Sequence, residues 1–329
     1  MSGLRLTHVG GPTVLIEAAG WRLLTDPTFD APGRRYAFGW GTSSRKLSGP
    51  ALAPEAVLPI DAVLLSHDHH DDNLDAAGRA LLPSAGAVVT TASGAGRLGG
   101  GARGLMPWQT TTLEAEGRPP LEITATPCRH GPPLSHPIVG DVIGFALRWP
   151  GQEHGVLWIS GDTVLYDGVR EVADRLTVDV ALLHLGGVQF PVTGPLRYTM
   201  TARQAVALCT LLRPRTVVPI HYEGWKHFRE GREQVERELA AAPPEVRERV
   251  RWLALGCRRR SVPETVLMRA AREYASGSAR LLLRRPRPPG RVRESGRRAG
   301  PGIAGREPFT TAPNPPASPP PGGRSHDRR

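Results

Sequence analysis

The feature that most constrains this chain is a dense cluster of ligand-type side chains directly after a short apolar run. The apolar run, residues 62–65, predicts a buried strand. Imidazole and carboxylate groups are the ligands that Zn²⁺, Mn²⁺ and Fe²⁺ take in proteins. A solvated acidic turn rarely carries three histidines within four residues, so the cluster favours a metal site over a charged turn. Its members are His67, Asp68, His69, His70, Asp71, Asp72 and Asp75.

Further potential ligands follow three later apolar strands, each close to the carboxyl end of its strand. The predicted strands cover 121–126, 156–160 and 216–220, and the ligands are His130, Asp162 and His221. Loops gather around functional sites at such strand ends. One coincidence of this kind carries little weight, but four in order along the chain predict one site built from four strand ends.

Alternating apolar runs and amphipathic segments predict an α/β fold. The chain opens with a predicted β-meander over 4–25, and further strands are predicted at 87–91, 110–114, 142–149, 178–184 and 250–255. Predicted helices cover 74–82, 167–176, 201–212 and 228–240, the third of them capped by Thr199 or Thr201. Two segments rich in glycine, 28–50 and 97–107, are predicted to be loops.

Composition limits the class of protein. Hydrophobic residues make up 40% of the 329, which is enough for a full core. No apolar run is long enough to cross a membrane, and the N-terminus lacks the pattern of a secretory signal. The three cysteines are odd in number and far apart, which argues against a disulfide framework and favours a cytoplasmic protein.

The C-terminal segment differs in composition from the rest of the chain. Residues 284–329 hold 11 of the 33 prolines and few apolar side chains, so we expect them to be disordered, after a helix over 261–283. Residues 281–329 contribute +8 of the net charge of +11, which leaves +3 for the 280 residues before them. A nucleic-acid partner is therefore not expected of the folded part, predicted to span residues 1–260.

The spacing of these residues resembles the metallo-β-lactamase-fold hydrolase superfamily over roughly residues 4–257. The pattern of that superfamily is H-x-H-x-D-H, a lone histidine, an aspartate in a G-D-T-like turn and a final histidine after a strand. Residues 67–72, His130, 161–163 and His221 match it. The turns at 24–27 and 161–163 look closest to the branch with L-ascorbate-6-phosphate lactonase and N-acyl-phosphatidylethanolamine phospholipase D. The resemblance implies a four-layer αββα sandwich.

The resemblance also implies two divalent metal ions, Zn²⁺ or Mn²⁺, that share a bridging hydroxide. Asp72 stands where the pattern has a histidine, so the second site is expected to be weak, or to select Mn²⁺ over Zn²⁺. In an alternative register, His70, Asp72 and Asn73 fill the H-x-D-H positions and Asp68 replaces the first histidine. The unshifted register keeps both histidines and the aspartate. It assigns His67, His69 and His130 to the first metal, Asp71, with Asp72, and His221 to the second, and Asp162 to both.

The activity implied by this resemblance is metal-dependent hydrolysis of an ester, lactone or related acyl compound. Asp71 or Asp72 would orient the nucleophile and carry its proton. One alternative is a phosphodiesterase or phospholipase D-like hydrolase of the same fold. Another is a non-catalytic metal-binding protein with a basic, nucleic-acid-binding tail. A small molecule is the expected substrate, and a homo-oligomer is compatible with the sequence.

Four further side chains are candidates for a role at the site, and three of them have two readings each. His184 ends a predicted strand and is either a catalytic group or a structural histidine. Asp26, at another strand end, either fixes the tautomer of a ligand histidine or forms a turn before proline. Arg129 either binds an anionic substrate group or forms a surface salt bridge. His227 is a candidate pocket residue.

Overall fold

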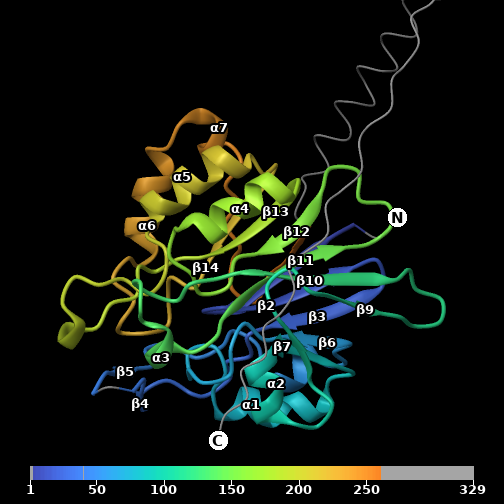
Figure 1. The fold of residues 1–329 in the computed structure, drawn as a ribbon, viewed down its shortest axis with the longest axis horizontal. Coiled ribbons are helices and arrows are strands. Elements are labelled where there is room, and N and C mark those ends of the chain that lie inside the picture. Colours follow the sequence, from blue (N-terminus) through green and yellow to red (C-terminus); the bar gives the residue numbers. More distant parts are fainter. Residues whose placement is uncertain (1–2, 40, 261–329) are drawn as a thin grey trace, which may run out of the picture. The chain divides into compact units, whose positions relative to one another are not determined.

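Two β-sheets form the centre of the fold (Figure 1). The computed structural model describes residues 3–39 and 41–260. The predicted helix over 261–283 and the predicted disordered segment over 284–329 lie outside the described residues. No helix in the described part of the chain is both long and apolar enough to span a membrane.

The first sheet has seven strands. The N-terminal strands pair antiparallel, whereas β3, β6, β7 and β8 run parallel to one another. In spatial order the strands are β15 (Arg258–Arg260), β1 (Arg5–Gly10), β2 (Thr13–Ala18), β3 (Trp21–Thr25), β6 (Ala62–Leu64), β7 (Val88–Thr91) and β8 (Arg103–Leu105).

The second sheet has six strands, of which β12, β13 and β14 are parallel and the others antiparallel. Their spatial order is β14 (Thr216–Ile220), β13 (Val178–His184), β12 (Val156–Ile159), β11 (Ile143–Arg148), β10 (Leu121–Pro127) and β9 (Thr110–Leu113). A separate two-stranded sheet pairs β4 (Arg35–Ala37) with β5 (Ser43–Arg45).

Helices cover the outer faces of both sheets (Figure 1). Against the first sheet lie α1 (Ala76–Leu81) and α2 (Ala92–Leu98); against the second lie α4 (Asp167–Arg175), α5 (Ala202–Leu212), α6 (Arg232–Ala240) and α7 (Pro244–Arg247). A one-turn helix, α3 (His136–Val139), connects β10 and β11. The 3₁₀ helices are η1 (Pro54–Val57), η2 (Leu82–Ser84) and η3 (Pro191–Thr193).

The alternation of side chains along each strand produces three hydrophobic layers. In β13, Val180 and Leu182 pack between the sheets, while Ala181 and Leu183 face the helices. In β6, Ala62 and Leu64 pack between the sheets, and Val63 packs with the residues around α1. This is the period of two that strands impose. The predicted four-layer αββα sandwich is therefore confirmed.

Several predicted boundaries were wrong for local reasons. The helix expected over 74–82 begins after Asp75, whose side chain accepts the Gly78 N–H as an N-cap. The helix expected over 228–240 begins only after Gly231. The loops predicted over 28–50 and 97–107 contain short strands, and the strand predicted over 250–255 is reduced to a single bridge at Val250. Thr201, not Thr199, caps α5, in a capping box with Gln204.

Candidate metal centre

The side chains that the sequence placed at strand ends meet at one edge of the two sheets. The loop after β6 carries the histidine cluster, whereas His130, Asp162 and His221 follow β10, β12 and β14. Among the described residues, three groups of ligand-type atoms lie within 4.8 Å of one another. They are His67 with His69 and His70; His67 with His130 and Asp162; and Asp72 with Asp162 and His221.

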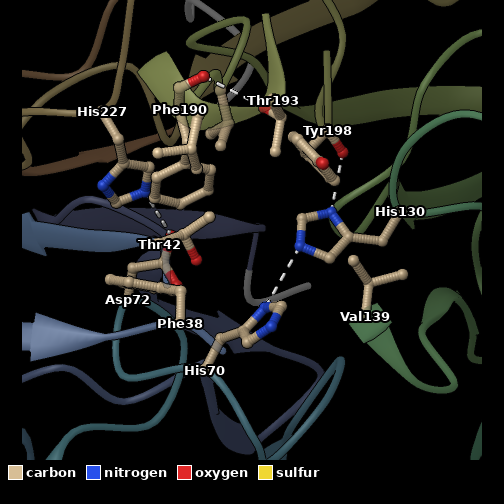
Figure 2. Close-up of a pocket in the computed structure, with 12 residues that line it drawn as sticks. Phe38, Thr42, His70, Asp72, His130, Val139, Phe190, Thr193, Tyr198 and His227 are labelled. Carbon is tan, nitrogen blue, oxygen red and sulfur yellow. Dashed lines mark hydrogen bonds and ion pairs between the residues drawn. The ribbon is translucent and has the colours of Figure 1, made fainter. Parts of the chain in front are cut away.

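Imidazole nitrogens converge in the first part of this centre. His70 Nδ1 lies 3.2 Å from both His67 Nε2 and His130 Nε2, and Figure 2 shows the His70 and His130 rings facing each other. Burial and the neighbouring histidines hold the pKa of His67 well below its ordinary value, and burial lowers that of His130 to about 4. The imidazoles of His67 and His130 are therefore neutral near pH 7, the form that binds metal.

Backbone carbonyls determine which ring nitrogens keep a lone pair. His130 donates its Nδ1–H to the Tyr198 carbonyl at 2.7 Å, which leaves Nε2 free. His69 donates its Nε2–H to the Val139 carbonyl, which leaves the buried Nδ1 without a hydrogen-bond partner among the described residues, although Asp68 Oδ1 lies 3.8 Å away. Gly140 is required beside this bond, because a Cβ there would lie 2.6 Å from His69 Cε1. Such outer contacts fix the tautomers of metal-binding histidines.

Carboxylates dominate the second part of the centre. Asp162 is fully buried, and neither of its oxygens has a hydrogen-bond partner in the part of the chain that the structure describes. His221 Nε2 lies 3.5 Å from Asp162 Oδ2 and 3.7 Å from Asp72 Oδ2. His221 Nδ1 faces the Leu185 carbonyl at 3.4 Å, so the proton belongs there and Nε2 presents a lone pair to the carboxylates.

Such an arrangement of buried lone pairs fits a bound cation. Unpartnered polar atoms are costly in a protein interior, and a lone pair facing two carboxylates is repulsive unless a positive charge lies between them. In the absence of a metal ion, a proton on His221 provides the positive charge. Burial opposes this protonation, but Asp162 and Asp72 raise the pKa of His221 to about 9. A divalent ion would provide the positive charge in place of the proton and would also satisfy the unpartnered oxygens of Asp162.

The structure brings together most, but not all, of the predicted ligands. Asp71 belongs to none of the three groups among the described residues; it is half-buried, and burial raises the pKa of its carboxyl. Asp72 points into the centre instead, with Asn73 buried beside it. The arrangement shares features of both registers: His69 lies in one group with His67, as the unshifted register expects, whereas His70 and Asp72 point into the centre, as the alternative register expects.

His184 lies next to His221, with ring centroids 5.5 Å apart, and lines neither the aromatic pocket over the centre nor the cavity beside it. Its side chain is fully buried, with Nε2 3.4 Å from Asp26 Oδ2, and burial lowers its pKa to about 3. Asp26 also accepts the Ser66 N–H at 2.7 Å, and the Ser66 hydroxyl is 2.9 Å from His67 Nδ1. Asp26 thus positions the start of the histidine loop through Ser66 and does not contact a candidate ligand in the three groups.

Two residues at this edge have left-handed backbone conformations. Asp26 has φ of 30° and His221 has φ of 57°, although neither is glycine. The His221 N–H donates to the Gly11 carbonyl at 2.9 Å, across from the turn between β1 and β2. Such strained conformations persist only where surrounding contacts enforce them, and they concentrate at functional sites.

An aromatic pocket of about 210 Å³ opens over the centre (Figure 2). Asp72, His70 and His130 reach it from the metal side, and it contains no lysine or arginine among the described residues that line it. The pocket walls are Phe38, Thr42, Val139, Val188, Phe190, Val192, Thr193, Tyr198 and His227.

His227 lines the aromatic pocket and also contacts Asp72, which the sequence did not reveal. Its Nε2 lies 2.9 Å from Asp72 Oδ2, and its ring stacks on Phe190 with centroids 5.0 Å apart. The sequence suggested a pocket position for His227 but gave no link to Asp72, 155 residues away. The Tyr198 and Val139 carbonyls were missed altogether, because every residue has a backbone carbonyl and no sequence signal marks these two.

Comparison with known proteins agrees with this geometry. The Beta-lactamase superfamily domain matches residues 21–222, more than half of the chain. A UPF0173 metal-dependent hydrolase of Opitutus terrae is 32% identical over 226 residues, covering 67% of this chain and 85% of the relative. One of Pyrobaculum calidifontis is 26% identical over 245 residues, covering 72% and 92%.

Solved structures show the same fold. A possible metal-dependent hydrolase from Veillonella parvula superposes with a TM-score of 0.67 at 16% identity, over 79% of this chain and all of the other. An isothiocyanate hydrolase from Delia radicum gut bacteria gives a TM-score of 0.64 at 20% identity, over 78% and 98%. The family match, the relatives and the buried His/Asp centre lead to one conclusion: the chain belongs to the metallo-β-lactamase superfamily, among its UPF0173 metal-dependent hydrolases.

Proposed function

We propose that this metal-dependent hydrolase cleaves an ester, lactone or related acyl compound with the help of two divalent ions. The observation that carries the proposal is a centre of buried, unpartnered ligand atoms that opens onto an aromatic pocket with no lysine or arginine among the described residues of its wall. Water adds to the acyl carbon, the bond from that carbon to the leaving oxygen breaks, and the products are an acid and an alcohol.

The free lone pairs suggest how the ions would be held. His67 Nε2, His69 Nδ1 and His130 Nε2 would hold the first ion, with His70 Nδ1 also within reach. Asp72 and His221 would hold the second, and the two unpartnered oxygens of Asp162 would serve both. The second set is richer in carboxylate and therefore harder, which favours Mn²⁺ there, whereas the imidazole-rich set suits Zn²⁺. A ligand role for Asp71 stays a prediction that its position does not favour.

Protein groups around the pocket have separate tasks in the reaction. Bound ions of this kind lower the pKa of water and polarise the acyl oxygen. Asp72 Oδ1 has no partner in the described residues and is the available acceptor for the proton of the attacking water. His227 holds the other oxygen of Asp72 in place. The aromatic walls exclude bulk water from the reacting carbon.

The pocket favours an acyl substrate over a phosphodiester. A phosphodiester carries a negative charge into the site, and burial of a charge requires a partner. The described residues that line the aromatic pocket offer no lysine or arginine for it, so its only cationic partners there would be the metal ions, which already face Asp72 and Asp162. The ester or lactone group itself is neutral and makes no such demand.

A metal-reconstitution experiment tests the proposal. Purified protein is stripped with a chelator, reloaded with Zn²⁺ or Mn²⁺, and assayed on lactones, aryl esters and phosphodiesters. We expect up to two ions per chain and hydrolysis of esters or lactones only in the loaded protein. Asp162→Ala should lose both metal content and activity, whereas Asp179→Ala, which removes a half-buried carboxylate 3.7 Å from Arg215, should keep both.

Two results would count against the proposal. A protein that binds no metal and gains no activity with either ion ends the hydrolase assignment of this site. Turnover of phosphodiesters alone would transfer the proposal to a phosphodiesterase or phospholipase D-like reaction.

A further inference from the structure

A second cavity, of about 330 Å³, shares His130 and Val139 with the aromatic pocket. Both cavities therefore reach the same histidine of the metal centre. The second cavity differs from the first in having an arginine in its wall, Arg129, together with His136 and Asp141. One substrate molecule can thus place two chemically different groups on either side of the reacting carbon.

Most of the polar groups in the second cavity are already paired. His136 Nε2 lies 2.6 Å from Asp141 Oδ1, so those two side chains satisfy each other. The Cys128 thiol donates to the Ser160 carbonyl at 2.9 Å. Arg129 has no carboxylate within ion-pair distance among residues 3–39 and 41–260, and its buried Nε has no acceptor there. The surface salt bridge considered for Arg129 is therefore absent from the described part of the chain.

The Arg129 guanidinium is held in place without using its hydrogen-bond donors. Its carbon lies over the Tyr166 ring, 4.5 Å from the ring centroid. This cation–π contact uses none of the N–H donors of the guanidinium, which stay available. Its backbone is anchored as well, because Arg129 N–H donates to Thr163 Oγ1 at 3.0 Å and its carbonyl accepts the Val164 N–H at 2.9 Å.

We propose that Arg129 binds a carboxylate of the substrate in the second cavity, while an apolar group of the same substrate occupies the aromatic pocket. A guanidinium binds a carboxylate through two parallel N–H bonds. One unpaired guanidinium balances one charge, which suits a carboxylate better than a phosphate dianion. The inference rests on the proposed acyl hydrolysis and specifies its substrate as an ester or lactone that bears an apolar group and a carboxylate.

A matched pair of esters tests the role of Arg129. The substrates are 4-nitrophenyl pentanoate and the mono-4-nitrophenyl ester of succinic acid, which are similar in size and differ in one carboxylate. The metal-loaded protein should prefer the succinate ester in kcat/KM. Arg129→Met should lower kcat/KM for that ester by about 10–100-fold, the range for loss of a charged hydrogen-bonded pair. It should leave the pentanoate ester within about twofold.

Two control variants separate charge recognition from structural effects. Arg129→Lys keeps the positive charge but loses the two parallel N–H donors of the guanidinium, so it should retain part of the preference for the succinate ester. Arg170→Met removes an exposed arginine of α4 that lies near Asp167, and should change neither ester. An equal loss on both esters in Arg129→Met, or no loss on either, would overturn the inference.

A binding measurement keeps the inference testable if neither ester is hydrolysed. 4-Phenylbutyrate and its neutral amide are titrated into metal-loaded wild-type protein and Arg129→Met by calorimetry. We expect the carboxylate to bind about 10-fold more tightly than the amide in the wild type, and the advantage to vanish in the variant. Persistence of the advantage in the variant would assign the carboxylate to the metal ions and refute a role for Arg129.

Discussion

Replacing Lys46 with methionine should destabilise the fold by about 3 kcal/mol. Lys46 Nζ lies 2.8 Å from Asp75 Oδ2, and the two side chains are only 4% and 0% exposed. Removal of one partner from a buried ion pair costs roughly 3–5 kcal/mol, because the other charge is left buried. Asp75 keeps three backbone N–H donors, from Phe29, Asp30 and Gly78, so we expect the lower end of that range.

Urea unfolding followed by tryptophan fluorescence measures this loss, and thermal unfolding should show a fall in Tm of about 6–12 °C. The only other lysine of the chain, Lys226, is exposed and provides the matched control. Lys226→Met should change stability by less than about 0.5 kcal/mol. A loss below about 1 kcal/mol in Lys46→Met, as is typical of exposed pairs, would refute the view that Asp75 depends on this lysine.

Two other predictions concern the metal centre and the acid stability. His227→Ala removes the donor to Asp72 and should weaken metal binding about 10-fold, measured by competition with a chromophoric chelator; unchanged affinity would mean that Asp72 is held by other groups. Burial opposes ionisation of Asp30, but hydrogen bonds from a backbone amide and the Tyr36 hydroxyl lower its pKa. Its ionised form therefore stabilises the fold above the unfolded pKa of about 4, and this contribution is lost as the pH falls through the folded value. Asp30→Asn should flatten the fall in urea midpoint between about pH 5 and 3, and a parallel fall in both proteins would contradict this assignment.

The strand-end ligands could be predicted because two local rules determine them. An apolar run identifies a buried strand, and parallel neighbours such as β13 and β14 bring their carboxyl ends to the same edge. The sequence also narrowed the cap of α5 to Thr199 or Thr201, and the structure shows that Thr201 caps it, in a capping box with Gln204. The signal for a strand end and the signal for a helix cap each lie within a few residues of the feature that they predict.

The sequence did not predict features that depend on contacts between residues far apart in the chain. Whether Asp71 or Asp72 enters the centre is a matter of one residue in an irregular loop, decided by His221 and His227 from the other sheet. The position of Arg129 depends on Tyr166, which only the folded chain places beneath it. The strand β15 pairs with β1, about 250 residues earlier, and carries no apolar pattern of its own.

Each half of the metal centre draws its ligands from both sheets, and this links ion uptake to the order of folding. Asp72 follows a strand of the first sheet, whereas Asp162 and His221 follow strands of the second, and His221 is further tied to the Gly11 carbonyl of the first. The ligand set proposed for a second ion is therefore complete only after the two sheets have docked. By mass action, an ion bound there stabilises the docked state over every partly assembled one. An ion at this position would thus stabilise the contact between the two sheets, and it could find its full ligand set only after the two halves of the chain had come together.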